Sequence, residues 1–82
     1  MTEAQAVEVA LAARQEMEVP EGARVSGAER AYIELAEGRP EEPSRVRDVL
    51  VWLVRFVLGG GRWVELAISD PTTEVVRVRR SR

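Results

Sequence analysis

Three consecutive glycines, at positions 59–61, separate two segments rich in β-branched, leucine and aromatic residues, 46–58 and 62–69. Residues of these types favour strands, and a short glycine loop between two such strands is typical of an antiparallel hairpin. The tetrapeptide Asp-Pro-Thr-Thr at 70–73 fits a type I turn, because Asp is favoured at the first position and Pro at the second. A third strand is then expected at 74–80. The C-terminal half is therefore predicted to be a three-stranded meander.

The turn lengths determine which strand residues lie opposite one another, because successive side chains of a strand point to opposite faces of the sheet. One face gathers apolar residues and is predicted to form the core, with the opposed pairs Trp52–Ile68, Val54–Leu66, Phe56–Val64, Leu66–Val78 and Ile68–Val76. The other face, which we call the outer face, receives Arg55, Glu65 and Arg79 in one row. Opposite charges in adjacent positions support this register, at about 0.2–1 kcal/mol per pair.

Residues 3–18 predict an amphipathic helix that begins at a Thr2 cap. Pro20 and Gly22 are expected to end it. Its apolar side consists mainly of Ala and Val, which allows close packing on a sheet, and contains Ala6, Val7, Val9, Ala10, Leu11, Ala13 and Met17.

Residues 23–37 fit two patterns. The Ser-x-x-Glu spacing at 26–29 is that of a helix capping box, and Gly38 suits a helix C-terminus. Apolar and polar residues nevertheless alternate over 30–35, as in a strand. We favour the strand, because the sheet gains more from a further strand than the fold gains from a second helix, and we keep the helix as the alternative. Residues 38–44 are expected to be a loop.

The whole chain of 82 residues is predicted to be one α+β domain, with the N-terminal amphipathic helix packed on a three- to four-stranded antiparallel sheet whose meander spans 45–80. A chain of this length buries roughly 60–65% of its unfolded surface on folding. That supports one apolar layer between helix and sheet, with little left to enclose a deep pocket.

The absence of two residue types restricts the chemistry of the chain. It contains no Cys and no His, which removes disulfides, thiolate nucleophiles, the commonest general base and the commonest metal ligand. Glu41 and Glu42 are adjacent in the expected loop and so are not held as an acid–base pair. We expect no enzyme activity, no catalytic residues, no cofactor and no metal site.

The two halves of the chain carry opposite charge. Residues 1–44 contain ten Glu and four Arg, a net −6, whereas residues 45–82 contain eight Arg and four acidic residues, a net +4. An acidic helix face over a basic sheet face accounts for this without a charged partner. The alternative is a small nucleic-acid-associated protein, which would use the C-terminal cluster Arg77, Arg79, Arg80 and Arg82. Trp63 is the one aromatic ring expected beside that cluster, whereas sheets that bind single strands normally offer several.

The outer face is predicted to carry much apolar surface. Trp63 falls on it beside Val49, Val51, Leu53 and Val57. Such a face is unusual for a monomer, so we expect it to be covered by residues 23–44 or a second subunit, or to bind a partner. A homodimer is the simplest cover. The predicted partner-binding residues are Trp63, Val51, Leu53, Arg55 and Arg77, with nucleic acid disfavoured and no membrane contact.

The segment Val51–Val78 resembles the PepSY family of small domains. The pentapeptide at 52–56, Trp-Leu-Val-Arg-Phe, looks like the family's Trp-x-Val-x-Phe strand, and the glycines before Trp63 are similar to its glycine turn. Residues 68–75 look like its Val-Asp-Ala-x-Thr-Gly-Glu-Val hairpin, although Thr73 stands where the family has Gly. The resemblance implies a cystatin-like arrangement and a role in binding or restraining another protein, often a peptidase.

The N-terminal residues lack the basic and apolar regions of a signal peptide. The longest apolar stretch, 49–58, is interrupted by Arg55 and too short to span a bilayer. As it stands the chain is expected to be cytoplasmic, and exported if a signal peptide has been removed.

Without His or Cys, the protein should not bind zinc tightly and should not hydrolyse general esterase or peptidase substrates. Equilibrium dialysis followed by elemental analysis checks this expectation. A transition metal retained in stoichiometric amount after dialysis would contradict it.

Overall fold

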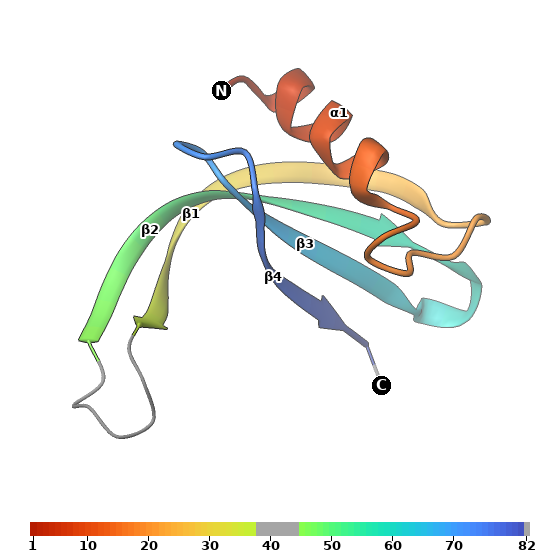
Figure 1. Cartoon of the computed structure of the whole chain (residues 1–82). Helices are drawn as coiled ribbons and strands as arrows, with labels where there is room; N and C mark the ends of the chain where they lie inside the picture. The colour runs from red at the N-terminus through yellow and green to blue at the C-terminus, as the bar shows by residue number, and fades with distance from the viewer. Residues whose placement is uncertain (38–44, 82) are drawn as a thin grey trace.

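One helix packs on one face of a four-stranded antiparallel sheet (Figure 1). The computed structural model describes residues 1–37 and 45–81. The elements are α1 (Glu3–Ala13), β1 (Arg24–Glu37), β2 (Arg45–Val57), the 3-10 turn η1 (Gly59–Gly61), β3 (Trp63–Ser69) and β4 (Val75–Arg80). The predicted α+β class is confirmed, whereas the loop predicted at 38–44 lies outside the described residues. Within the described ranges, no helix combines the length and apolar character needed to cross a bilayer.

The strands pair in chain order, β1-β2-β3-β4. The predicted register of the first hairpin is confirmed, with Trp52 opposite Ile68, Val54 opposite Leu66 and Phe56 opposite Val64. Gly60 and Gly61 both have φ of 75° in its turn, a left-handed conformation that glycine adopts without strain.

The second hairpin departs from the prediction at one point. Leu66 lies opposite Val78 as expected, but Ile68 lies opposite Val75 rather than Val76. A β-bulge between Ala67 and Ile68 accommodates an extra residue in β4 and shifts the register. Val76 consequently packs with the apolar side chains of the outer face.

Residues 24–37 form strand β1, so the strand pattern of this segment prevails over the helical one. β1 pairs with β2 along its whole length, from Arg24 opposite Val57 to Glu37 opposite Arg45. The register shifts between Val25 and Gly27, which leaves Ser26 as the extra residue. Ser26 therefore caps no helix, and its hydroxyl donates to the Arg55 carbonyl at 3.3 Å.

The helix begins where the sequence indicates but its regular part is shorter. Thr2 and Gln5 form a reciprocal capping box, in which the Gln5 N–H donates to Thr2 Oγ1 and the Thr2 N–H donates to Gln5 Oε1. The α-helix ends at Ala13, not at residue 18.

A turn over residues 14–18 follows the α-helix. Glu18 has φ of 57°, and the Val19 N–H donates to the Arg14 carbonyl at 2.8 Å while the Glu18 N–H donates to the Gln15 carbonyl. These bonds are those of a Schellman motif, which ends a helical path. The Arg14 guanidinium also donates to the carbonyls of Pro20 and Glu21, which fixes the chain beyond the turn.

The main core lies between α1 and the sheet. Ala6 and Ala10 face the sheet and have no exposed surface. Because their side chains are small, α1 can lie close to the sheet. Leu11, expected on the apolar side of the helix, is instead 42% exposed. The buried members of this core are Ala6, Ala10, Val19, Ala23, Trp52, Val54, Phe56, Val64, Leu66 and Ile68.

Trp52 belongs to this core, as predicted, and its indole nitrogen has a partner. Nε1 donates to Asp70 Oδ2 at 3.0 Å, which ties β2 to the turn after β3. A buried indole N–H without an acceptor would destabilise the fold.

A second apolar cluster, which we call the outer cluster, lies on the face opposite α1. Its buried members are Ile33, Val49, Val51 and Ala67. The C-terminal half of β1 and the N-terminal half of β2 curve away from α1, so the outer face lies on the inside of the bend (Figure 1). Side chains on the inside of a bent sheet lie closer together, which accounts for the complete burial of Val51.

Leu66→Ala should lower the free energy of unfolding by about 2–5 kcal/mol, because Leu66 is fully buried at the centre of the main core. Leu11→Ala makes the same chemical change at an exposed site and should change it by no more than about 0.5 kcal/mol. Urea denaturation of both variants measures the difference. Equal losses would show that the main core is not where the structure has it.

Candidate functional site

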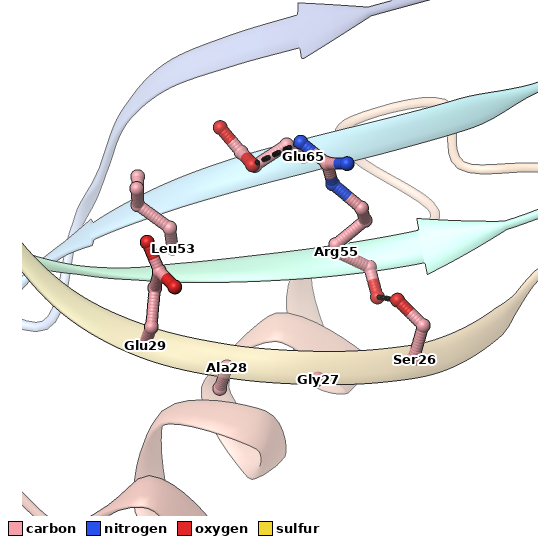
Figure 2. A pocket seen from close by; sticks show the side chains of 7 residues that line it. All are labelled: Ser26, Gly27, Ala28, Glu29, Leu53, Arg55 and Glu65. Atoms are coloured by element: carbon pink, nitrogen blue, oxygen red, sulfur yellow. Dashed lines mark hydrogen bonds and ion pairs between the residues drawn. The ribbon is translucent and has the colours of Figure 1, made fainter.

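A shallow hollow of about 370 Å³ lies on the outer face where β1, β2 and β3 meet (Figure 2). Its lining consists of Ser26, Gly27, Ala28, Glu29, Leu53, Arg55 and Glu65. Gly27 lies opposite Arg55 in the sheet, and a Cβ there would meet nothing within 4 Å. The space above Gly27 is therefore open, which lets a ligand atom approach the backbone between the side chains of neighbouring residues.

Two rows of opposed residues cross the four strands at this site. One consists of Glu29, Leu53, Ala67 and Arg77, and the other of Gly27, Arg55, Glu65 and Arg79. The predicted outer-face row of Arg55, Glu65 and Arg79 is therefore confirmed. The second row alternates arginines with a glycine and a carboxylate, and the first has a carboxylate at one end and an arginine at the other. This part of the outer face therefore offers both hydrogen-bond donors and acceptors.

The central polar contact is an ion pair between Arg55 and Glu65. Arg55 Nη2 lies 3.0 Å from Glu65 Oε2, and Glu65 is only 7% exposed. The same guanidinium lies 4.4 Å from the centroid of the Trp63 ring. A cation over an indole face at an accessible site stabilises the arrangement by about 0.5–1 kcal/mol. Arg55 is thus held in one orientation by a carboxylate and a ring together.

The structure brings four of the five predicted partner-binding residues to an accessible part of this face. Leu53, Arg55, Trp63 and Arg77 are all partly exposed. Val51 is the exception, since it has no exposed surface and belongs to the outer cluster. It therefore supports the site from within the sheet and presents no surface to a partner.

Sequence reasoning did not place Gly27 and Glu29 in the site, because the conformation of residues 23–37 remained open. Once that segment is a strand, side-chain parity puts both on the outer face opposite Arg55 and Leu53. Glu65 was predicted in the charged row, but its burial was not. The sequence signal for the burial of Glu65 was its position between two arginines on adjacent strands, Arg55 and Arg79.

The C-terminal arginines do not form one patch. Arg79 lies opposite Glu65, whereas Arg80 is opposite Val64 and donates to the carbonyls of Met17 and Glu18. Arg77 Nε is buried without a hydrogen-bond partner among the described residues. Arg82 lies outside the described part of the chain.

The site is suited to binding through hydrogen bonds, ion pairs and ring contacts. In residues 1–37 and 45–81, no group of three or more acidic, His or Cys side chains is arranged to hold a metal ion. No family model, curated protein or solved structure matches this chain.

A double-mutant cycle of Arg55→Gln and Glu65→Gln should give a coupling energy of about 1 kcal/mol, because one partner is buried and the other is half exposed. The coupling should fall as salt is added, since the exposed end of the pair is screened. Chemical denaturation of the four proteins measures it. Glu29→Gln, a change at an exposed carboxylate of the same hollow, is the matched control and should alter stability little.

Proposed function

We propose that this chain is a non-enzymatic protein-binding module that holds a segment of a protein partner on the outer face of its sheet. The supporting observation is the oriented Trp63–Arg55–Glu65 group beside an open hollow. In the described residues, α1 lies on the opposite face and no other element covers this group (Figure 1).

The residue types at this face suit an interface with protein. Trp and Arg are enriched where association free energy is concentrated, and here they are stacked on each other. Leu53 supplies an apolar surface in the hollow, while Glu29 offers a carboxylate for N–H groups of a ligand. Because Arg55 is already held by Glu65, little side-chain entropy is lost when a partner binds to it.

The resemblance of Val51–Val78 to PepSY domains suggests which partners to consider first. The proposed module is PepSY-like and cystatin-like, and it restrains a peptidase by occupying part of the enzyme's surface. This assignment rests on the strand and turn residues of the resemblance, together with the partial exposure of Leu53, Arg55 and Trp63 on the outer face.

A nucleic-acid-binding role has less support. Arg80 donates to the backbone of the turn that follows α1, and Glu29 and Glu65 put carboxylates among the outer-face arginines. A phosphate backbone would be repelled by these carboxylates and would meet only one aromatic ring, Trp63.

Peptides selected on the wild-type protein from a phage-displayed library should bind at the outer face. Trp63→Glu should weaken their binding at least about tenfold, the change expected for an interface residue that contributes about 1.4 kcal/mol or more. Leu11→Glu places the same charge on the exposed side of α1 and should leave binding unchanged. NMR chemical-shift changes should centre on Leu53, Arg55 and Trp63.

Selected peptides that bind Trp63→Glu as tightly as the wild type would contradict the proposed site. Circular dichroism of both variants shows whether they remain folded.

A further inference from the structure

Strand β1 forms a long open edge of the sheet. It spans 14 residues, Arg24–Glu37, and pairs with β2 on one side only. Among residues 1–37 and 45–81, no backbone hydrogen bond reaches its other side. An edge of this length presents a row of unpaired N–H and C=O groups, which is a template for pairing with a further strand.

The sequence of β1 is complementary to itself when it is read antiparallel about Tyr32. In that register Arg30 of one copy lies opposite Glu34 of the second, and the two-fold symmetry repeats the pair. We propose that two copies of this chain pair β1 with β1, antiparallel and centred on Tyr32, to form one continuous sheet.

Charge selects this register over its neighbours. Two-fold pairing centred on Glu29, Arg30 or Glu34 places that charged residue opposite itself, and pairing centred on Ile33 places Glu29 opposite Glu37. Pairing centred on Ala31 places Glu29 opposite Ile33 and forms no ion pair. Directly opposed like charges destabilise a strand pair and opposite charges stabilise it. The Tyr32-centred register alone combines opposed opposite charges with no opposed like charges.

The apolar residues agree with the same register. A two-fold axis that relates antiparallel neighbours in one sheet runs perpendicular to the sheet, so each face stays on its own side. Ala31 then lies opposite Ile33 of the second copy on the outer face, which joins the outer clusters of both copies. The two Tyr32 rings meet on the α1 side, where each is 72% exposed in the single chain.

The helix leaves room for the second copy. Val25 and Ala28, near the start of β1, pack on the main core below α1. Tyr32, Glu34 and Ala36 on the same face are exposed, so α1 does not cover this part of the strand.

A second copy fits this edge better than it fits the outer face. Of the five apolar residues expected on the outer face, Val49 and Val51 are already buried within one chain, which leaves less apolar surface for a second copy to cover there. Arg30 and Glu34 of β1, by contrast, are exposed and would face charges of opposite sign in a second β1. In the described part of the chain, Glu34 forms no ion pair, and Arg30 lies over the Trp52 ring at 5.8 Å.

Charge exchange tests the proposal. Arg30→Glu alone and Glu34→Arg alone should each be monomeric, because two like-charge pairs then face each other. Mixing these two variants should restore a dimer that contains one copy of each, and Arg30→Glu combined with Glu34→Arg in one chain should restore the homodimer. Sedimentation velocity over a concentration series measures the assembly of each sample.

Two matched variants change charge away from the edge. Arg62→Glu and Glu74→Arg lie in exposed turns and should both remain dimeric. A wild type that stays monomeric throughout the series would overturn the proposal. So would a dimer that Trp63→Glu dissociates and Arg30→Glu leaves intact, and that result would place association on the outer face.

Disulfide trapping tests the register independently, because the chain has no cysteine of its own. Tyr32→Cys places two thiols opposite each other at the two-fold axis, with Cα atoms about 5 Å apart, within disulfide range. It should cross-link on mild oxidation. Glu34→Cys thiols would be offset by four residues, about 13 Å along the strands, and should not. Efficient cross-linking of Glu34→Cys with none at Tyr32→Cys would overturn the register.

Discussion

Burial of strand β2 on both faces is the constraint on which the rest of the structure depends. Trp52, Val54 and Phe56 are buried against α1, while Val49 and Val51 are buried in the outer cluster. A strand buried on both sides needs neighbours on both edges and cover on both faces. β1 and β3 supply the edges, α1 covers one face, and the bend of the sheet closes much of the other (Figure 1). The hollow lies on the remaining part of the outer face, beside Leu53 and Arg55.

Local patterns in the sequence were sufficient to predict the C-terminal hairpin. The three glycines and the period-two alternation around Phe56 determine a register that the structure confirms. The bulge in β4 was not predictable, because Val75 and Val76 are the same residue type and parity cannot say which of them faces the core. The early end of α1 was not predicted either, because residues 14–18 are residue types that suit a helix. The contact that holds Arg14 after the helix is with a backbone carbonyl, that of Pro20, and a backbone acceptor leaves no mark in the sequence.

The alternation of side chains along the strands was enough to predict which residues of the candidate site share a face. It was not enough to predict which of them the curvature of the sheet buries. Parity placed Leu53, Arg55 and Trp63 on one face, and they lie there. Val51 is buried in a cluster with Ile33, Val49 and Ala67, and parity places these residues on one face without showing that they pack tightly enough to bury it. Gly27 lies in the site because residues 24–37 form a strand. The alternation over 30–35 indicated that strand, but the bulge at Ser26, which sets the face of the residues before it, could not be predicted.

The strictly sequential strand order also bears on how the chain folds. Each strand pairs with the strand next to it in the chain, so no β-pairing has to wait for an intervening element to be placed. Sheets assembled from neighbouring segments have lower contact order than sheets with crossovers, and low contact order is associated with fast folding. β2 belongs to two of the three hairpins, so its pairing with either neighbour presents a preformed edge to the other. β3 has the same position, so the two central strands together form the part of the sheet onto which the two edge strands can add.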